Sequence, residues 1–196
     1  ECLAIVGESG AGKSMIAHAL LGLTPDEAVV TAEALRIDGI ELREADERAW
    51  RDVRGSRIAL VSQDALVSLD PFRRIGLEVA EPLEIHTADS ASERVRRAEA
   101  ALDAVAMPDA PRRMRAYSHE LSGGLRQRAL IAAALVTQPR IVVADEPTTA
   151  LDATVQLRIL TLLREIVDAG TALVVISHDL AAVTHRPVTY WLHIDH

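Results

Sequence analysis

The stretch GESGAGKS, from Gly7 to Ser14, constrains the fold of this chain more than any other feature. It follows the apolar run CLAIV at residues 2–6, which is typical of a buried strand, and it opens a helical pattern over residues 14–23. A glycine-rich loop in this position lets consecutive main-chain N–H groups converge on phosphate oxygens, and the helix N-terminus adds its positive dipole. The context favours a phosphate-binding loop over a glycine-rich turn that only tolerates a lysine.

Each part of this loop has an expected role. Lys13 reaches the β- and γ-phosphates of a bound nucleotide, and the hydroxyl of Ser14 ligates Mg²⁺. The residues expected to bind the nucleotide here are Gly7, Glu8, Ser9, Gly10, Ala11, Gly12, Lys13, Ser14 and Met15.

Other apolar runs predict a parallel sheet. Residues 57–62, 140–145 and 171–177 are continuously apolar rather than alternating, which is typical of strands that are buried on both faces. A helical pattern over residues 154–168 stops at Gly170. Because strands and helices alternate, the predicted class is α/β, with a mainly parallel sheet at its core.

The middle of the chain breaks this alternation. Residues 64–138 contain no convincing buried strand, whereas Ser90 and Glu93 have the spacing of a capping box at a helix start. A last helix begins at residue 122 or 123 and cannot pass Pro139. We therefore expect a helical subdomain at residues 64–138, inserted into a core made of residues 1–63 and 139–185.

Four polar residues follow predicted strands directly. Asp145 and Glu146 follow one strand, and Gln63 and His178 follow two others, so all four are expected at the sheet edge where open α/β folds bind ligands. Asp145 is expected to coordinate Mg²⁺, and Glu146 to activate the attacking water. Gln63 could orient that water or contact Mg²⁺, and His178 could donate a hydrogen bond to the γ-phosphate. Each of these residues taken alone fits an ordinary surface residue. The functional interpretation therefore depends on all four occurring together in one chain.

Composition excludes some functions. The net charge of -8 disfavours a nucleic-acid partner. The single cysteine, Cys2, cannot form an internal disulfide, which fits a reducing compartment. No apolar run approaches the roughly 20 residues that span a bilayer, and the N-terminus lacks the pattern of a signal peptide. Any membrane is therefore expected to be reached through a partner.

The order of the motifs resembles that of the nucleotide-binding domains of ATP-binding cassette (ABC) transporters. These motifs are GESGAGKS, SQD at 62–64, LSGGLRQR from Leu121, IVVADEP from Ile141, TALD at 149–152 and SHD at 177–179. The stretches at residues 62–86, 117–135 and 144–156 are similar to the ATPase subunits of bacterial peptide/nickel importers. The fold implied is a P-loop NTPase core with an inserted helical subdomain.

The resemblance also implies cofactors and partners. It implies ATP and Mg²⁺, a second ATPase subunit arranged head to tail, membrane permease subunits near residues 63–81, and indirectly a solute-binding protein. Ser122, Gly123 and Gly124 would bind the γ-phosphate held by the other subunit, and Asp152 would communicate between the two sites. From the residues alone, Ser122 is a plausible helix N-cap, and an ordinary capped helix remains the alternative.

Two regions depart from the family pattern. The N-terminal edge strands, with the aromatic residue that stacks on adenine, are expected to be lacking, and Leu125 replaces a more usual glutamine or methionine. Residues 186–196 are expected to form an atypical solvated tail rather than a metal site at His193, Asp195 and His196.

The function expected from the resemblance is ATP hydrolysis coupled to uptake of peptides or nickel chelates, at the cytoplasmic face of a bacterial membrane. A soluble ABC ATPase and an inactive truncated fragment are the alternatives.

Overall fold

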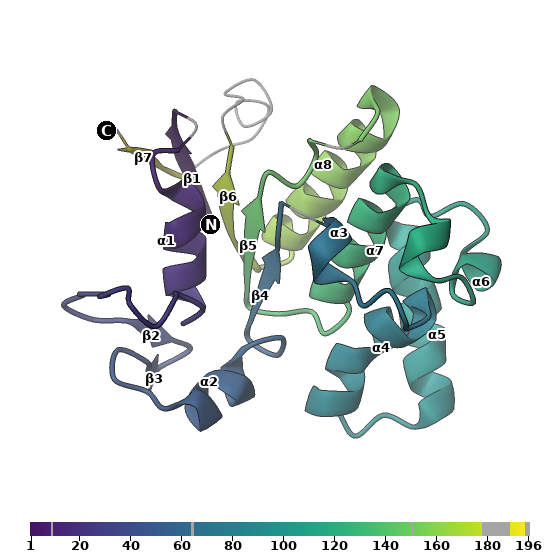
Figure 1. Ribbon diagram of the computed structural model, residues 1–196, viewed down its shortest axis with the longest axis horizontal. Coiled ribbons are helices and arrows are strands. Elements are labelled where there is room, and N and C mark those ends of the chain that lie inside the picture. The colour runs from purple at the N-terminus through teal and green to yellow at the C-terminus, as the bar shows by residue number, and fades with distance from the viewer. Residues whose placement is uncertain (9, 64, 150, 178–188, 195–196) are drawn as a thin grey trace.

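The structure, a computed structural model, describes residues 1–8, 10–63, 65–149, 151–177 and 189–194, and only the main chain of Leu66. Its centre is a parallel sheet of five strands in the order β4-β5-β6-β1-β7 (Figure 1). The strands are β1 Cys2–Gly7, β4 Ile58–Val61, β5 Ile141–Asp145, β6 Ala172–Ile176 and β7 Tyr190–Ile194. The four apolar runs that predicted buried strands correspond to β1, β4, β5 and β6.

Alternate residues of β1, β4, β5 and β6 enter two hydrophobic clusters, one on each face of the sheet. On β5, Val142 and Ala144 join the cluster that contains Ile159 of helix α8, whereas Val143 joins the cluster that contains Ala17 of helix α1. The two helices are α1 Lys13–Leu20 and α8 Ala153–Asp168. Because both faces are covered, the strands need apolar side chains at every position, as their continuous runs indicated.

Helices gather beyond β4 on one side of the sheet, where Figure 1 shows them in colours that run from blue through teal to green. They are α3 Ala65–Ser68, α4 Ile75–His86, α5 Ala91–Ala104, α6 Ala110–Arg113 and α7 Gly123–Leu135. The described residues between 65 and 138 contain no strand. The hydroxyl of Ser90 caps α5 by accepting a hydrogen bond of 3.2 Å from the main-chain N–H of Glu93, at the position that the capping-box spacing predicted.

A small unit between α1 and β4 was not assigned from the sequence. It consists of an antiparallel pair, β2 Arg36–Ile37 and β3 Ile40–Glu41, followed by α2 Glu47–Val53. Trp50 of α2 is buried in the cluster that also holds Ala17 of α1. This unit therefore covers the α1 face of the sheet.

The expectation of a solvated tail is wrong for residues 190–194. These residues form β7, which pairs in parallel with β1 in the register Leu3 to Tyr190. The aromatic side chains of Tyr190 and Trp191 remain exposed, so the strand is held by its main-chain ladder with β1 and by Ile194, which packs against the cluster that contains Ala17. Within the described part of the chain, no helix combines the length and the apolar character that crossing a membrane requires.

Candidate functional site

The phosphate-binding loop joins β1 to α1 without an insertion. β1 ends at Gly7, α1 begins at Lys13, and Gly12 occupies the N-cap position with a left-handed φ of 87°. Glycine adopts this conformation without the steric cost that a Cβ atom would bring. The exposed N–H groups at the start of α1 therefore face the loop, which is the geometry that binds anions.

Lys13 folds back over the loop. Its ammonium group donates hydrogen bonds of 2.9 Å to the carbonyl oxygen of Gly7 and 2.6 Å to that of Glu8, and the residue is only 8% exposed. Lys13 is the single lysine of the sequence, in which every other basic residue besides histidine is an arginine. A compact ammonium group held among carbonyls at this position can exchange them for phosphate oxygens.

Asp145 ends β5 beside the loop and is buried. Burial raises the pKa of this carboxyl group, while a hydrogen bond from the side chain of Ser14 opposes the shift, and the nearby charge of Glu146 adds to it. The Oδ1 atom of Asp145 is buried and has no hydrogen-bond partner among the described residues. A buried carboxylate oxygen beside a hydroxyl group is the donor set that a hard divalent cation prefers, so these residues fit Mg²⁺.

Glu146 follows Asp145 in an unusual backbone conformation. Its φ is 49°, in the left-handed region that residues with a Cβ atom rarely adopt, and its main-chain N–H donates to the carbonyl of Ile176 at 3.0 Å. The residue is 9% exposed. Such strain persists only where the surrounding structure imposes it, and it is common at functional sites.

These parts line one pocket of about 460 Å³. Its lining residues are Gly10, Gly12, Lys13, Ser14, Met15, Gln63, Asp145 and Glu146. The loop, the acidic pair and the residue after β4 thus converge as their positions at strand ends predicted, although they come from three separate parts of the chain. Gly7, Glu8 and Ala11 belong to the same loop without lining the pocket, and Ser9 and His178 lie outside the described residues.

The second glycine loop does not line this pocket. Ser122 caps α7 by accepting a hydrogen bond of 3.4 Å from the N–H of Leu125, and Gly123 and Gly124 form the first turn of that helix. Asp152 caps α8, where its Oδ1 accepts bonds of 3.1 Å from the N–H groups of residues 154 and 155. Ser122 and Gly123 lie at a helix start, as expected, Asp152 also caps a helix, and none of these residues lines the pocket around Lys13.

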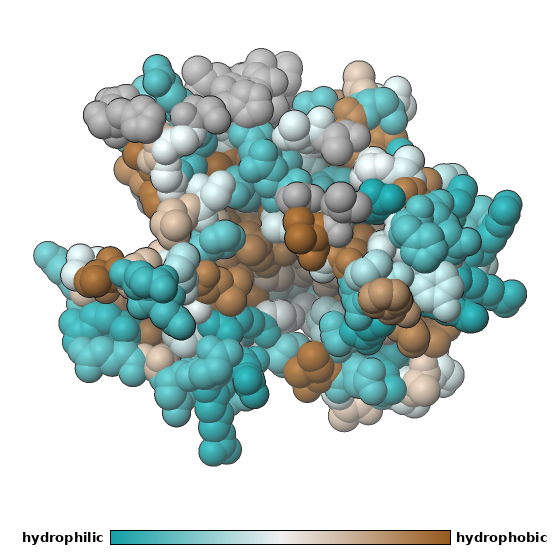
Figure 2. Space-filling view, viewed as in Figure 1, coloured by the Kyte–Doolittle hydropathy of each residue, from teal (hydrophilic) through white to brown (hydrophobic). Residues whose placement is uncertain are grey.

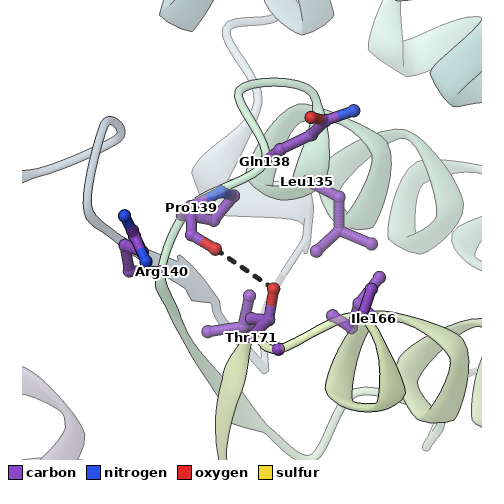
Figure 3. Close-up of a pocket in the computed structure, with 9 residues that line it drawn as sticks. Leu135, Gln138, Pro139, Arg140, Ile166 and Thr171 are labelled. Carbon is purple, nitrogen blue, oxygen red and sulfur yellow. Dashed lines mark hydrogen bonds between the residues drawn. The ribbon is translucent and has the colours of Figure 1, made fainter.

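A hollow of about 430 Å³ lies at the opposite, amino-terminal ends of β5 and β6 (Figure 3). Leu135 and Ile166 face each other on one side of it, and Arg140 lies on the other. The hydroxyl group of Thr171 already donates to the carbonyl of Pro139 at 3.3 Å. Among the described residues, Arg140 is the one charged residue that lines this hollow and no acidic residue lines it, so the described lining lacks the groups that phosphate chemistry needs.

Comparison with known sequences agrees with the geometry. The sequence model of a family described as "ABC transporter" matches residues 1–149. The oligopeptide transport ATP-binding protein OppD of Salmonella typhimurium is 45% identical over 184 residues, which cover 93% of this chain and 55% of that protein. The dipeptide transport ATP-binding protein DppD of Lactococcus lactis subsp. cremoris is 42% identical over 185 residues, covering 93% and 53%. The chain spans about half the length of the curated relatives it matches.

Solved structures share the fold. A dimeric post-hydrolysis state of the ATP-binding cassette MJ0796, bound to ADP and Pi, superposes with a TM-score of 0.83 at 31% identity, covering 93% of this chain and 76% of that one. A second dimeric structure of MJ0796, described as a bacterial ABC transporter cassette, gives a TM-score of 0.84 at 29% identity, covering 98% and 81%. The α/β fold with a parallel core is therefore that of ABC cassettes, as predicted.

Proposed function

The chain belongs to the ABC transporter family, and on that premise we propose that it is the ATP-binding and ATP-hydrolysing subunit of an importer for peptides. The observation that carries the proposal is the convergence of Lys13, Ser14, Asp145 and Glu146 on one pocket. A positive charge, a hydroxyl and two carboxylates in this order are the parts that phosphoryl transfer to water requires. The likeness to peptide transport proteins favours peptides, with nickel chelates as the other substrate class of that branch.

The proposed reaction assigns one task to each residue. Lys13 and the N–H groups of Gly10 and Gly12 hold the phosphates of ATP. Ser14, Gln63 and, through water, Asp145 would hold Mg²⁺, which neutralises charge on the β- and γ-phosphates when it is bound.

Glu146 accepts a proton from the attacking water, and the γ-phosphate leaves ADP as inorganic phosphate. His178 would donate a hydrogen bond to the transferred phosphate.

The second glycine loop is proposed to act on a partner. Ser122, Gly123 and Gly124 lie outside their own pocket, at the N-terminus of a 13-residue helix, where an anion is stabilised. A second ATPase subunit, identical or different, would place its bound ATP against this helix start, with Asp152 between the two sites. The dimeric cassettes of similar fold support this arrangement.

Membrane permease subunits are proposed to bind the segment after Gln63. Three large apolar side chains of this segment are exposed, namely Val67 at 80%, Phe72 at 88% and Leu77 at 57%. Exposed apolar side chains gathered in one segment are typical of an interaction surface. The subunit would then work at the cytoplasmic face of a bacterial membrane and meet a solute-binding protein only indirectly. No nucleic-acid partner is proposed.

Within this assembly we propose that the chain has the two parts that its sequence indicates, an ATPase core and a helical subdomain. Residues 1–63 and 139–185 would form the ATPase core, and residues 64–138 the helical subdomain that carries the second glycine loop. Residues 190–194 would add β7 to the edge of that core, beside β1.

The proposal is tested by expressing the protein together with candidate permease subunits and measuring ATP hydrolysis and peptide uptake. The variant Phe72→Ala should weaken co-purification with the permease subunits and leave basal ATP hydrolysis unchanged. Co-purification with ribosomes or DNA instead would favour a soluble ABC ATPase. An unfolding temperature that Mg-ATP does not shift, together with no hydrolysis, would favour an inactive fragment.

A further inference from the structure

Thr149 contacts the proposed general base directly. It lies in the turn that follows β5, and its hydroxyl group is 3.2 Å from the Oε2 atom of Glu146 and 3.2 Å from the carbonyl oxygen of the same residue. The main-chain N–H of Thr149 also points to that carbonyl oxygen, at 3.4 Å. The hydroxyl proton is therefore shared between the main chain and the carboxylate of one residue.

The main chain of Glu146 is fixed, but a main chain does not fix a glutamate side chain. The left-handed φ of 49° and the hydrogen bond to Ile176 set where the Cβ atom points. Three further torsions still separate Cβ from the carboxylate oxygens, and the last of them is broad and weakly restrained. The hydrogen bond to Oε2, 3.2 Å long and shared with the carbonyl oxygen, restricts these torsions, because the carboxylate must stay within reach of the Thr149 hydroxyl group.

We propose that Thr149 is a positioning residue for ATP hydrolysis. By holding Oε2 of Glu146, its hydroxyl group fixes where the other carboxylate oxygen lies and so aligns the base with the attacking water. The proton that leaves water goes to Glu146, and Thr149 gives up no proton. This inference rests on the proposed function, because it needs Glu146 to act as the base.

The principal test compares Thr149→Val, which keeps the shape of the side chain and removes the hydroxyl group, with Thr149→Ser, which keeps the hydroxyl group. Loss of alignment should cost a part of the roughly 10²–10⁴-fold contribution of a general base. We therefore expect Thr149→Val to lower kcat about tenfold with KM unchanged, and Thr149→Ser to restore most of it. Thr148→Val is the matched control, since no hydrogen bond joins the Thr148 side chain to Glu146 among the described residues, and it should leave kcat within about twofold.

A double-mutant cycle separates positioning from a structural role. If Thr149 acts through Glu146, Thr149→Val should cost little further activity in a Glu146→Gln background. The affinity for a fluorescent ATP analogue and the thermal midpoint should stay close to those of the unchanged protein. Should Thr149→Val fail to fold, Thr149→Ala carries the same test.

Three outcomes would overturn the inference alone while the unchanged protein hydrolyses ATP. They are an unaffected kcat in Thr149→Val, a change confined to KM, and an equal further loss in the Glu146→Gln background. Absence of hydrolysis in the unchanged protein would instead overturn the proposed function, and this inference with it.

Discussion

The ammonium nitrogen of Lys13 lies 2.9 Å from the carbonyl oxygen of Gly7, six residues earlier in the chain. In the proposed complex with ATP this ammonium group turns to the phosphates. Because Lys13 is the single lysine of the sequence, acylation of a lysine side chain reports on this site. We predict that Mg-ATP at 10 times its Kd lowers acylation of Lys13 about tenfold, as measured by mass spectrometry of the modified peptide.

The α-amino group of the protein provides the internal control for this labelling, and its acylation should not depend on nucleotide. Equal labelling of Lys13 with and without Mg-ATP would contradict its contact with phosphate.

Alanine variants of two helix-capping serines distinguish an effect on stability from an effect on ATP hydrolysis. Ser122 caps α7 and Ser90 caps α5, each by accepting one main-chain N–H. Replacing either by alanine should lower the free energy of unfolding by about 1 kcal/mol, as measured by urea denaturation. Only Ser122→Ala should also reduce ATP hydrolysis, because only this helix start is proposed to face a γ-phosphate. A similar loss of activity in both variants would argue against that role.

The packing of α2 on α1 can be tested at Gly22. This residue has a φ of 62°, and a Cβ atom added there would overlap the ring of Trp50. Gly39 has a φ of 81°, and a Cβ atom added to Gly39 would meet no atom within 4 Å. Gly39→Ala should therefore cost about 1 kcal/mol of stability for its backbone alone. Gly22→Ala should cost about 1–3 kcal/mol more, measured by the same denaturation. Equal losses would mean that Trp50 does not pack as described.

Glu78 of α4 should make stability depend on pH. Its side chain is 10% exposed and lines the hollow between the α2 side and the helices α3 to α7, which Figure 2 shows at the centre of the molecule. Burial raises the pKa of Glu78, against a hydrogen bond from the N–H of Asp70 and the charge of Arg73, while the charges of Glu81 and Asp70 add to the rise. The folded state thus binds this proton more tightly than the unfolded state.

The sign of the effect follows from that difference. Stability contributed by Glu78 is present below its unfolded pKa and is lost as pH rises through the folded value. Relative to the unchanged protein, Glu78→Gln should therefore gain stability as pH rises from about 4 to 7. Glu93 is the control of opposite sign, because a hydrogen bond from Arg96 lowers its pKa. Glu93→Gln should lose relative stability over the same range, and slopes of one sign in both variants would contradict the assignment.

Much of the fold could be predicted because its strands are buried on both faces. Continuous apolar runs located β1, β4, β5 and β6, and the glycine-rich loop fixed the β1 to α1 connection. The pair β2 and β3 could not be found, because two-residue strands are too short to carry a periodic pattern. β7 was not predicted, because the side chains of residues 190–193 are exposed and only Ile194 packs against the core.

The candidate site, too, contains residues that could be predicted from the sequence and features that could not. Lys13 and Ser14 were predicted from the glycine-rich loop, and Asp145, Glu146 and Gln63 from their places at strand ends, and all five line one pocket. The left-handed backbone of Glu146 and the contact from Thr149 depend on the shape of a turn, which residue spacing does not report. The sequence did offer one signal for the contact from Thr149. Threonine hydroxyl groups in turns often form hydrogen bonds with nearby groups of the same turn.

In the proposed reaction, Glu146 is the base that activates water. Glu146→Gln keeps the size of the side chain and removes its ability to take a proton. We predict that steady-state ATP hydrolysis by this variant falls about 10²–10⁴-fold, while its affinity for Mg-ATP stays within about threefold of that of the unchanged protein. Hydrolysis within a factor of about two of the unchanged rate would contradict the account.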